Sequence, residues 1–353
     1  MSTSRLCRLV TAFAASAALV ACSQPANSST PPTDPGPSSS TTLTVVTHDS
    51  FAMSEELKAR FAAESGLDVT YVAPGDGGAL VNQLVLTKDA PLGDVVYGID
   101  NSFSSRAVQE GVIAEYDSAA LPPSASQFTT EALTPIDFGD VCVNADLQWF
   151  EDNGIPVPTT LDDLVEPQYK DLFVVTNPAS SSPGLSFLLA TIATFGEDGY
   201  LDYWDGLVDN GVSVVRGWSD AYYTEFSGAD GEGPRPLVVS YATSPAYTVT
   251  EDGSRSTTVA LLGTCFRQVE YAGVIEGAQN EQGAQQFIDF LLSEDVQSGI
   301  PEAMFMYPVT DVALPQEWVD FAPLSDHALT LDPAATSANR STWIKAWTAK
   351  VIG

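Results

Sequence analysis

Basic residues are scarce in this chain. Its 353 residues include 14 lysines and arginines against 46 aspartates and glutamates, which gives a formal net charge of −32. Because so acidic a surface repels phosphate backbones, the composition argues against a nucleic-acid-binding protein. The same surface attracts cations diffusely, but acidic surfaces are also common solubility devices, so the net charge alone identifies no ligand.

Histidine is scarce too, since only His48 and His327 are present. The sequence has neither a Gly-x-Ser-x-Gly nucleophile elbow nor a His-Glu-x-x-His metal motif. A Ser-His-Asp set could be drawn with His48 and Asp49, but nothing in the sequence orients it. We therefore expect a protein that is not an enzyme, carries no cofactor and binds no metal, with an exported hydrolase as the alternative.

Apolar runs of membrane-spanning length are also lacking. Residues 9–21 are apolar and follow two arginines, but they are too few to cross a bilayer. They end in Leu19-Val20-Ala21-Cys22, which resembles a bacterial lipobox, where the chain is cut before the cysteine and the thiol is lipidated. We predict a lipoprotein signal peptide over residues 1–21, lipidation at Cys22, and an extracytoplasmic protein anchored to the cell membrane. A plain secretory signal with an incidental cysteine is the alternative.

The segment that follows is poor in apolar residues. Residues 22–42 are dominated by serine, proline and threonine, a composition that cannot bury enough surface to fold, and we predict a disordered tether. The remaining stretch of roughly 300 residues exceeds one comfortable core and suggests two lobes.

Cysteine is limited to four positions. Cys7 lies in the predicted signal peptide and Cys22 is the predicted lipidation site, which leaves Cys142 and Cys265 in an oxidising compartment. Two such thiols are most simply a disulfide, and two buried free thiols are the alternative.

The body of the chain alternates short β-branched runs with amphipathic segments. Residues 42–47, 69–73 and 94–98 are predicted strands, with helices predicted between them, and this alternation favours parallel pairing. Further strands are predicted at 141–144, 171–176, 212–216, 237–240 and 265–272. Helices are predicted at 159–165, 199–208, 281–293 and 333–351, and a loop with a strand at 300–309.

Two segments combine aromatic and hydroxyl side chains directly after predicted strands. They are Arg216 to Tyr223 (RGWSDAYY) and Val238 to Tyr247 (VVSYATSPAY). Open α/β sheets bind ligands at the carboxyl ends of their strands. We therefore predict that Trp218 and Tyr241 form an aromatic box for a small planar ligand, although both could be ordinary core aromatics.

The same segments carry a resemblance to the thiamine-binding proteins of bacterial ABC importers. Five further segments match that family in the same order: Thr47–Phe51 (THDSF), Asp76–Gly77, Gly98–Asn101 (GIDN), Ser181–Leu185 (SSPGL) and Met306–Val309 (MYPV). The resemblance implies a two-lobed α/β periplasmic-binding-protein type II fold whose domains are joined by a hinge. We expect one lobe over 43–138 and 268–353 and the other over 139–267, in a monomer that delivers thiamine, or its phosphates, to a permease.

The resemblance also implies ligand-binding positions. The first set comprises Asp76, Gly77, Ser181, Ser182, Trp218, Tyr241, Ala242, Thr243 and Ser244, and a second set comprises His48, Tyr247 and Phe305. The family often has Tyr at the position of His48 and Trp at that of Phe305, so the pose of the ligand is expected to differ here. A phosphate on the ligand would be expected at the helix start beside Ser181 and Ser182.

Other solutes remain open at this point. The adjacent tyrosines Tyr222 and Tyr223 are a ferric-iron signature in a sister branch of these binding proteins, and an acidic aromatic site could also suit a polyamine. The surrounding residues match the thiamine branch, which we take as the leading interpretation.

Overall fold

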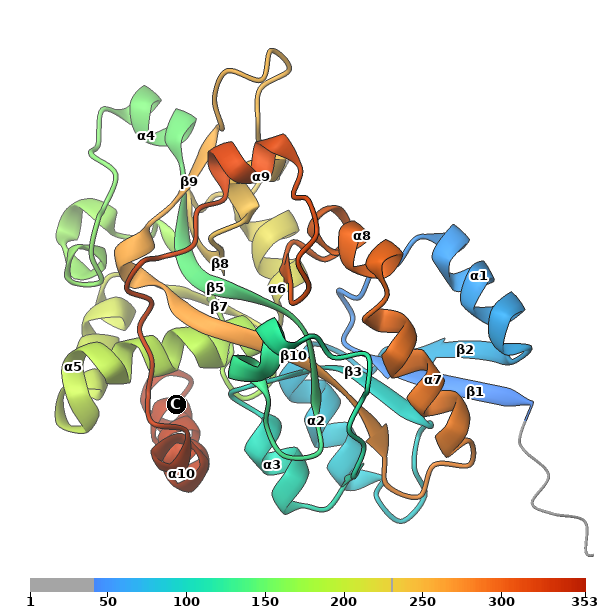
Figure 1. Ribbon diagram of the computed structural model, residues 1–353. Helices are drawn as coiled ribbons and strands as arrows, with labels where there is room; N and C mark the ends of the chain where they lie inside the picture. Colours follow the sequence, from blue (N-terminus) through green and yellow to red (C-terminus); the bar gives the residue numbers. More distant parts are fainter. Residues whose placement is uncertain (1–40, 230) are drawn as a thin grey trace, which may run out of the picture. The chain divides into compact units, whose positions relative to one another are not determined.

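The computed structural model describes residues 41–229 and 231–353, which form a mixed α/β body around one sheet (Figure 1). The predicted signal peptide, Cys22 and nearly all of the predicted tether lie outside the described residues. The strands are β1 (Thr42–Thr47), β2 (Asp68–Val72), β3 (Val95–Asp100), β4 (Ile113–Ala114), β5 (Thr134–Asp146), β6 (Phe173–Thr176), β7 (Ser213–Val215), β8 (Leu237–Tyr241), β9 (Thr258–Ala260), β10 (Phe266–Ile275) and β11 (Tyr307–Pro308). The helices are α1 (Glu55–Ser65), α2 (Gly77–Leu86), α3 (Ser104–Gln109), α4 (Leu147–Asn153), α5 (Ser182–Asp209), α6 (Trp218–Asp220), α7 (Glu281–Leu291), α8 (Glu294–Met304), α9 (Gln316–Phe321) and α10 (Pro333–Val351).

The main path of the sheet runs β2-β1-β3-β10-β5-β8-β6-β7. At one end β1 pairs in parallel with β2 and β3, and at the other β6 pairs in parallel with β7 and β8, as the strand–helix alternation predicts. Between them, β10 runs antiparallel to β3 and β5, and β5 runs antiparallel to β8. The two long strands β5 and β10 therefore join two parallel segments that are far apart in the sequence.

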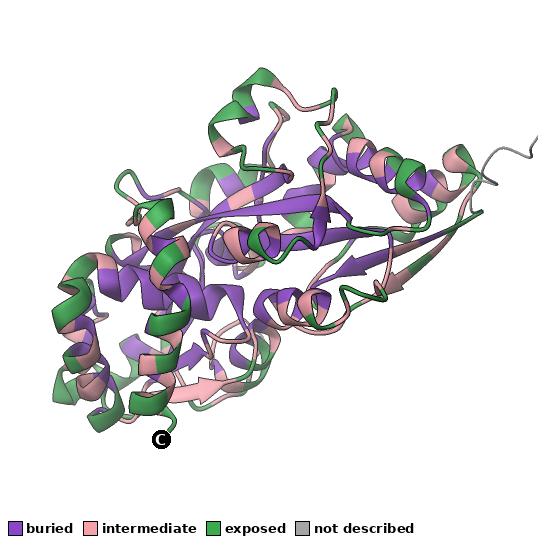
Figure 2. Cartoon of the chain, turned by 90° about the horizontal axis from the view of Figure 1, so that it is seen from below, coloured by how far each residue is buried: buried purple, intermediate pink, exposed green. Residues whose placement is uncertain are grey.

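Helices cover both the ends and the middle of this sheet. The α7 helix packs on β1, β3 and β10, α2 packs on β3, and the long α5 helix packs on β5, β8 and β10. The strands are mostly buried, whereas most residues of α10 are exposed or half-buried (Figure 2). On the inner side of α10, Trp347 meets Trp204 of α5 edge-on at 5.3 Å between ring centroids, so this tryptophan serves packing.

Local capping sets several helix boundaries. The α1 helix begins after Ser54, whose hydroxyl accepts from the Leu57 amide, and ends at Gly66 with a left-handed φ of 70°. Within α5, Gly196 leaves helical geometry with φ 74° and ψ 171°, so the element is two helical stretches joined at a kink. Among the described helices, none has the length and apolar character needed to cross a bilayer.

Two predicted elements differ from the structure. Only Asp162–Val165 of the predicted helix 159–165 is helical, as a 3₁₀ turn, because the Asp163 carboxylate accepts from the Thr159 and Thr160 amides and holds the chain in a tight turn. Most of 300–309 is not strand: α8 continues through Pro301 to Met304 and ends at Phe305, which has a left-handed φ of 60°. A strand follows only at Tyr307–Pro308.

A disulfide joins Cys142 of β5 to Cys265, which directly precedes β10. Both residues are fully buried, and the neighbouring pair Val141 and Phe266 lie opposite each other in the β5–β10 ladder. The bridge therefore links the two antiparallel strands at the middle of the sheet, across 123 positions of sequence.

Removing this bridge is expected to destabilise the protein. Because it closes a long loop, the C142S/C265S double variant should lose about 2–5 kcal/mol of unfolding free energy in denaturant titrations. A reducing agent should lower the unfolding free energy of the wild type by a similar amount, and it should not change that of the double variant. Equal stability of the oxidised wild type and the double variant would contradict this role.

Candidate binding site

A cavity of about 260 Å³ lies where the β1–α1 loop, the start of α5, the α6 segment and the end of α8 meet. Six of the twelve predicted ligand residues line it: His48, Asp76, Ser182, Trp218, Tyr241 and Phe305. Unpredicted lining residues are Asp49, Ser50, Ala52, Pro183, Ser219, Tyr223, Glu270, Ala303, Met304 and Met306. The structure therefore gathers residues from across the sequence around one space.

Trp218 and Tyr241 share this cavity, each with less than a tenth of its surface exposed. Their rings lie 6.2 Å apart at 63°, so they form an edge-on corner rather than two parallel plates. The Trp218 indole stacks on Tyr222 at 5.0 Å and 16°, and its Nε1 donates to the Ser240 hydroxyl at 2.9 Å. The indole is thus fixed from behind, which leaves its remaining surface for the cavity.

The remaining predicted residues lie behind the wall of the cavity. Gly77 is the first residue of α2, and the Ser181 hydroxyl caps α5 and bonds to Thr176. The other four belong to the loop after β8: Ala242, Thr243 and Ser244 are fully buried, and the Tyr247 ring packs on Phe305 at 3.7 Å. Ser244 bonds to Ser240, and Thr243 donates to the Phe305 carbonyl. Ser244, through Ser240, therefore supports Trp218, and Thr243 and Tyr247 support Phe305.

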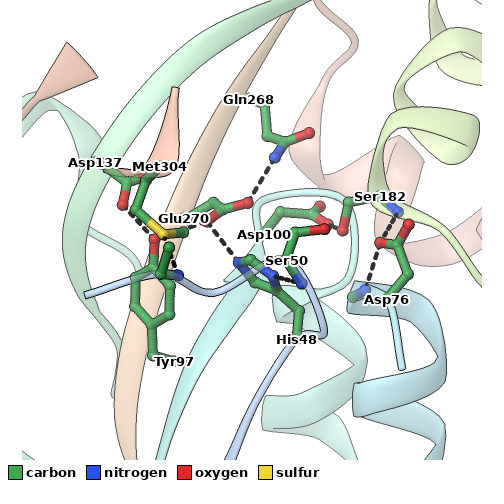
Figure 3. A network of polar contacts seen from close by, with 12 residues as sticks. His48, Ser50, Asp76, Tyr97, Asp100, Asp137, Ser182, Gln268, Glu270 and Met304 are labelled. Carbon is green, nitrogen blue, oxygen red and sulfur yellow. Dashed lines mark hydrogen bonds and ion pairs between the residues drawn. The ribbon is translucent and has the colours of Figure 1, made fainter. Parts of the chain in front are cut away.

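The Asp76 carboxylate joins three separate segments, and Figure 3 shows its contact with Ser182. Its Oδ1 accepts from the Gly77 amide at 2.6 Å and from the Ser182 amide at 3.2 Å. Its Oδ2 accepts from the Trp218 amide at 3.0 Å. One side chain therefore caps α2 and also ties it to the beginnings of α5 and α6.

Close packing at the same place requires glycine. A Cβ on Gly77 would come 2.1 Å from the Ser182 hydroxyl, and one on Gly78 would come 2.8 Å from the Ser180 backbone. Glycine at these two positions therefore lets α2 approach the α5 segment closely enough for the Asp76 bonds to form.

Behind the cavity lies a network of buried acids that the sequence analysis did not predict (Figure 3). Glu270 of β10 faces the cavity, with Oε2 3.4 Å from His48 Nε2 and 2.9 Å from the Tyr97 hydroxyl. Its Oε1 accepts from Gln268 at 2.9 Å, and Gln268 also donates to the Tyr241 hydroxyl at 3.3 Å. A glutamate inside the predicted strand 265–272 was the one available sequence signal.

Two carboxylates of this network share one hydroxyl donor. The single Tyr97 hydroxyl proton lies between Glu270 and Asp137, whose Oδ2 is 2.5 Å from the hydroxyl, so it can serve only one of them. Burial, with the adjacent Glu270, raises the pKa of Asp137 well above its usual range. Burial opposes ionisation of Glu270 as well, but His48 and the donors of Tyr97 and Gln268 outweigh it and lower its pKa. Tyr97 is therefore the hydroxyl donor between two buried carboxylates, and burial disfavours ionisation of Asp137 more than that of Glu270.

His48 lies between this network and the cavity. Its Nδ1 accepts from the Ser50 amide at 3.2 Å, so Nε2 carries the proton and points toward Glu270. Burial acts to lower the pKa of His48, but Glu270, Asp76 and Asp49 together raise it above its usual value. Nδ1 thus accepts a hydrogen bond, and Nε2 lies within ion-pair distance of Glu270.

Acidic side chains dominate the charge of the cavity. Asp49, Asp76 and Glu270 line it, while no lysine or arginine from residues 41–229 and 231–353 does so. Burial and the nearby Asp76 charge raise the pKa of Asp49 above its usual value. The space therefore favours a cation carrying an aromatic ring.

A buried aspartate beneath the cavity makes stability depend on pH. Asp100 accepts from the Ser182 hydroxyl and the Ser102 amide, yet burial raises its pKa from 3.8 to about 6. The folded state holds the Asp100 proton more tightly than the unfolded state does. The contribution of Asp100 to the free energy of unfolding therefore falls as the pH rises from about 4 to above 6. The D100N variant should therefore gain up to about 3 kcal/mol relative to the wild type over that interval.

Urea unfolding at pH 4, 5, 6 and 7 measures this difference, with D220N at an exposed aspartate as the matched control. Parallel pH profiles for D100N and the wild type would contradict the buried-proton assignment.

Comparison with known proteins places the chain in a family. The sequence model for "Bacterial extracellular solute-binding protein" matches residues 90–326. The chain belongs to this family. It is 32% identical over 313 residues to the thiamine-binding periplasmic protein of Escherichia coli K12, covering 86% of this chain and 92% of that protein. The thiamine-binding periplasmic protein of Brucella suis is 30% identical over 320 residues, covering 87% and 91%.

A solved structure supports the same placement. The chain is similar to a periplasmic thiamin-binding protein with a TM-score of 0.78 and 29% identity, over 88% of this chain and 96% of that one. The predicted fold class, a two-lobed α/β solute-binding protein of the periplasmic type II, is confirmed.

Proposed function

We propose that this protein is the extracytoplasmic receptor of an ABC importer and that thiamine is its solute. The observation that carries the proposal is a cavity combining Trp218, Tyr241 and Phe305 with the carboxylates of Asp49, Asp76 and Glu270. Thiamine offers a planar aminopyrimidine and a permanently cationic thiazolium, which match these two features. The names of the relatives point to the same solute.

The cation is the part of thiamine that this cavity would recognise most strongly. A ring cation against a desolvated indole gains about 2 kcal/mol, and an ionised carboxylate nearby adds Coulomb attraction. Trp218 supplies the indole, and Glu270, whose pKa is lowered by His48, Tyr97 and Gln268 despite its burial, supplies a buried negative charge. Gln268 donates to the Tyr241 hydroxyl as well as to Glu270, so the position of the Tyr241 ring is coupled to the Glu270 carboxylate.

Closure over the solute follows from where these residues originate. We propose lobes over 43–138 with 268–353 and over 139–267, hinged where the long strands β5 and β10 pass between them. His48, Asp49 and Asp76 would then come from one lobe, and Ser182, Trp218 and Tyr241 from the other. A solute that contacts both sets stabilises the closed state, and that state would dock on the permease.

The cellular setting belongs to the same proposal. A monomer lipidated at Cys22, with residues 22–42 as tether, would keep the receptor close to a membrane permease. No catalytic step is part of this function, and the His48 imidazole faces the Glu270 carboxylate at 3.4 Å. Iron as the solute is not favoured, because the adjacent tyrosines do not both reach the cavity. Tyr222 is buried in a stack between Trp218 and Phe226, and of this pair only Tyr223 lines the cavity.

Thermal unfolding tests the solute. Protein that has been unfolded, freed of bound molecules and refolded should melt at a higher temperature with thiamine, by an amount equivalent to about 2.7 kcal/mol at 100 times the dissociation constant. Absence of any shift at saturating thiamine, across several ligand-free preparations, would defeat the proposal.

Removing the indole tests the site. The W218A variant should bind thiamine about 10- to 30-fold more weakly, because it loses the cation–π contact. The matched control is W149A, which removes a partly exposed indole from α4 that does not line the cavity and should leave affinity unchanged. Equal loss in both variants would show that the effect is not local to the cavity.

A further inference from the structure

Basic side chains gather around one cavity that shares no lining residue with the candidate binding site. This basic cavity has a volume of about 400 Å³ and lies between α2, α3 and α10, with Arg106, Arg340 and Lys345 in its lining. The whole chain has only 14 lysines and arginines against 46 aspartates and glutamates. Three of those cations around one space therefore reverse the sign of the local charge, and such a space attracts anions.

Arg340 of α10 is the most buried of these cations. Only 5% of its surface is exposed, and its Nε is buried without a hydrogen-bond partner among residues 41–229 and 231–353. The guanidinium lies over the Phe103 ring, with Cζ 5.3 Å from the ring centroid. A cation–π contact replaces only part of the hydration that a buried charge loses. The Arg340 guanidinium therefore lacks the anionic partner that buried charges usually have.

The surrounding groups do not neutralise this charge. In the part of the chain that the structure describes, no carboxylate lies within ion-pair distance of Arg340 or Arg106. Glu110 lines the basic cavity, but it is exposed and pairs with Lys88 at 3.6 Å. Burial and the neighbouring Arg106 lower the pKa of Arg340 to about 10, against a weaker opposing effect of Asp100. An anion between the two guanidiniums would offset the cost of burying this charge.

Arg106 of α3 is oriented by its neighbours. It is half-buried and donates to the Asn82 side chain of α2. The Asn82 amide nitrogen in turn donates to the Ala179 carbonyl at 3.4 Å. The Gln109 and Ser337 side chains, which are 2.6 Å apart, join α3 to α10 directly. The two helices that carry the guanidiniums are therefore held side by side, which preorganises the pair.

We propose that the basic cavity binds a free tetrahedral oxyanion, such as inorganic phosphate or sulfate, between Arg106 and Arg340, with Lys345 at the exposed rim. A guanidinium presents planar N–H donors that match two oxygens of such an ion, so two guanidiniums can share its four oxygens. A free ion is favoured over a phospholipid headgroup, because a chain with a formal net charge of −32 is repelled by an anionic membrane surface. The proposal does not depend on the proposed function.

Calorimetric titration and thermal unfolding in phosphate- and sulfate-free buffer test the proposal. Sulfate and phosphate should each bind saturably, with one ion per chain, and should raise the melting temperature at millimolar concentrations, because the ion binds only the folded state. Sodium chloride at the same ionic strength should give a much smaller shift, since it screens charge without supplying a tetrahedral oxyanion.

Three variants locate the ion. R340M removes the buried charge and should weaken sulfate binding about 10- to 100-fold, the loss expected for charge-assisted hydrogen bonds. R106Q should weaken it by a similar factor and provides the test if R340M does not fold. The matched control is R255M, which removes an exposed arginine that does not line the basic cavity and should leave sulfate affinity unchanged.

Stability without the ion gives a second measurement. In phosphate- and sulfate-free buffer, R340M should be no less stable than the wild type, because it removes a buried charge that has no carboxylate partner. Millimolar sulfate should then stabilise the wild type and R255M but not R340M. This comparison separates binding at the cavity from the general stabilising effect that sulfate has on proteins.

Two results would overturn the proposal outright. One is equal sulfate affinity in the wild type and in the folded R340M and R106Q variants, and the other is a response to sulfate no larger than that to chloride. Adsorption to phosphatidylglycerol vesicles that requires Arg106 and Arg340, without any heat from free phosphate or sulfate, would show that the assignment to a free ion is wrong.

Discussion

The structure around the cavity depends on one carboxylate, that of Asp76. It accepts hydrogen bonds from backbone amides at the starts of three helical segments, at positions 77, 182 and 218 of the sequence. Amide bonds to a charged acceptor are stronger than neutral ones, and here they converge where glycine allows close approach. The positions of Ser182 and Trp218 relative to α2, and thus the shape of the cavity, follow from this set of bonds.

A second constraint is the cost of burying negative charge. The chain places Asp100, Asp137 and Glu270 in or beneath the cavity, and each is accommodated differently. Burial raises the pKa of Asp137 well above its usual range, Asp100 accepts from hydroxyl and amide donors, and His48, Tyr97 and Gln268 lower the pKa of Glu270. This arrangement leaves one deep negative charge facing the space, which is what a cationic solute requires.

Much of this could be predicted from the sequence, for identifiable reasons. Trp218 and Tyr241 follow β-branched runs, so the sequence predicts that they lie at the ends of strands. The Cys142–Cys265 disulfide could be predicted because these are the two cysteines left in an exported chain. The direction of side chains after β8 was not visible, because Thr243 and Ser244 turn inward to bond with Phe305 and Ser240. The acid network was missed because Glu270 and Asp137 sit in strands whose neighbours are apolar, and their partners are distant in sequence.

The central claim is that this acidic, aromatic cavity holds thiamine. Calorimetric titration of refolded, ligand-free protein tests it most directly, since stoichiometry and affinity come from one experiment. The account predicts saturable binding of one thiamine per chain, weakened when Glu270 is replaced by glutamine. No saturable heat with thiamine, alongside tight binding of an unrelated solute such as ferric citrate or spermidine, would contradict it.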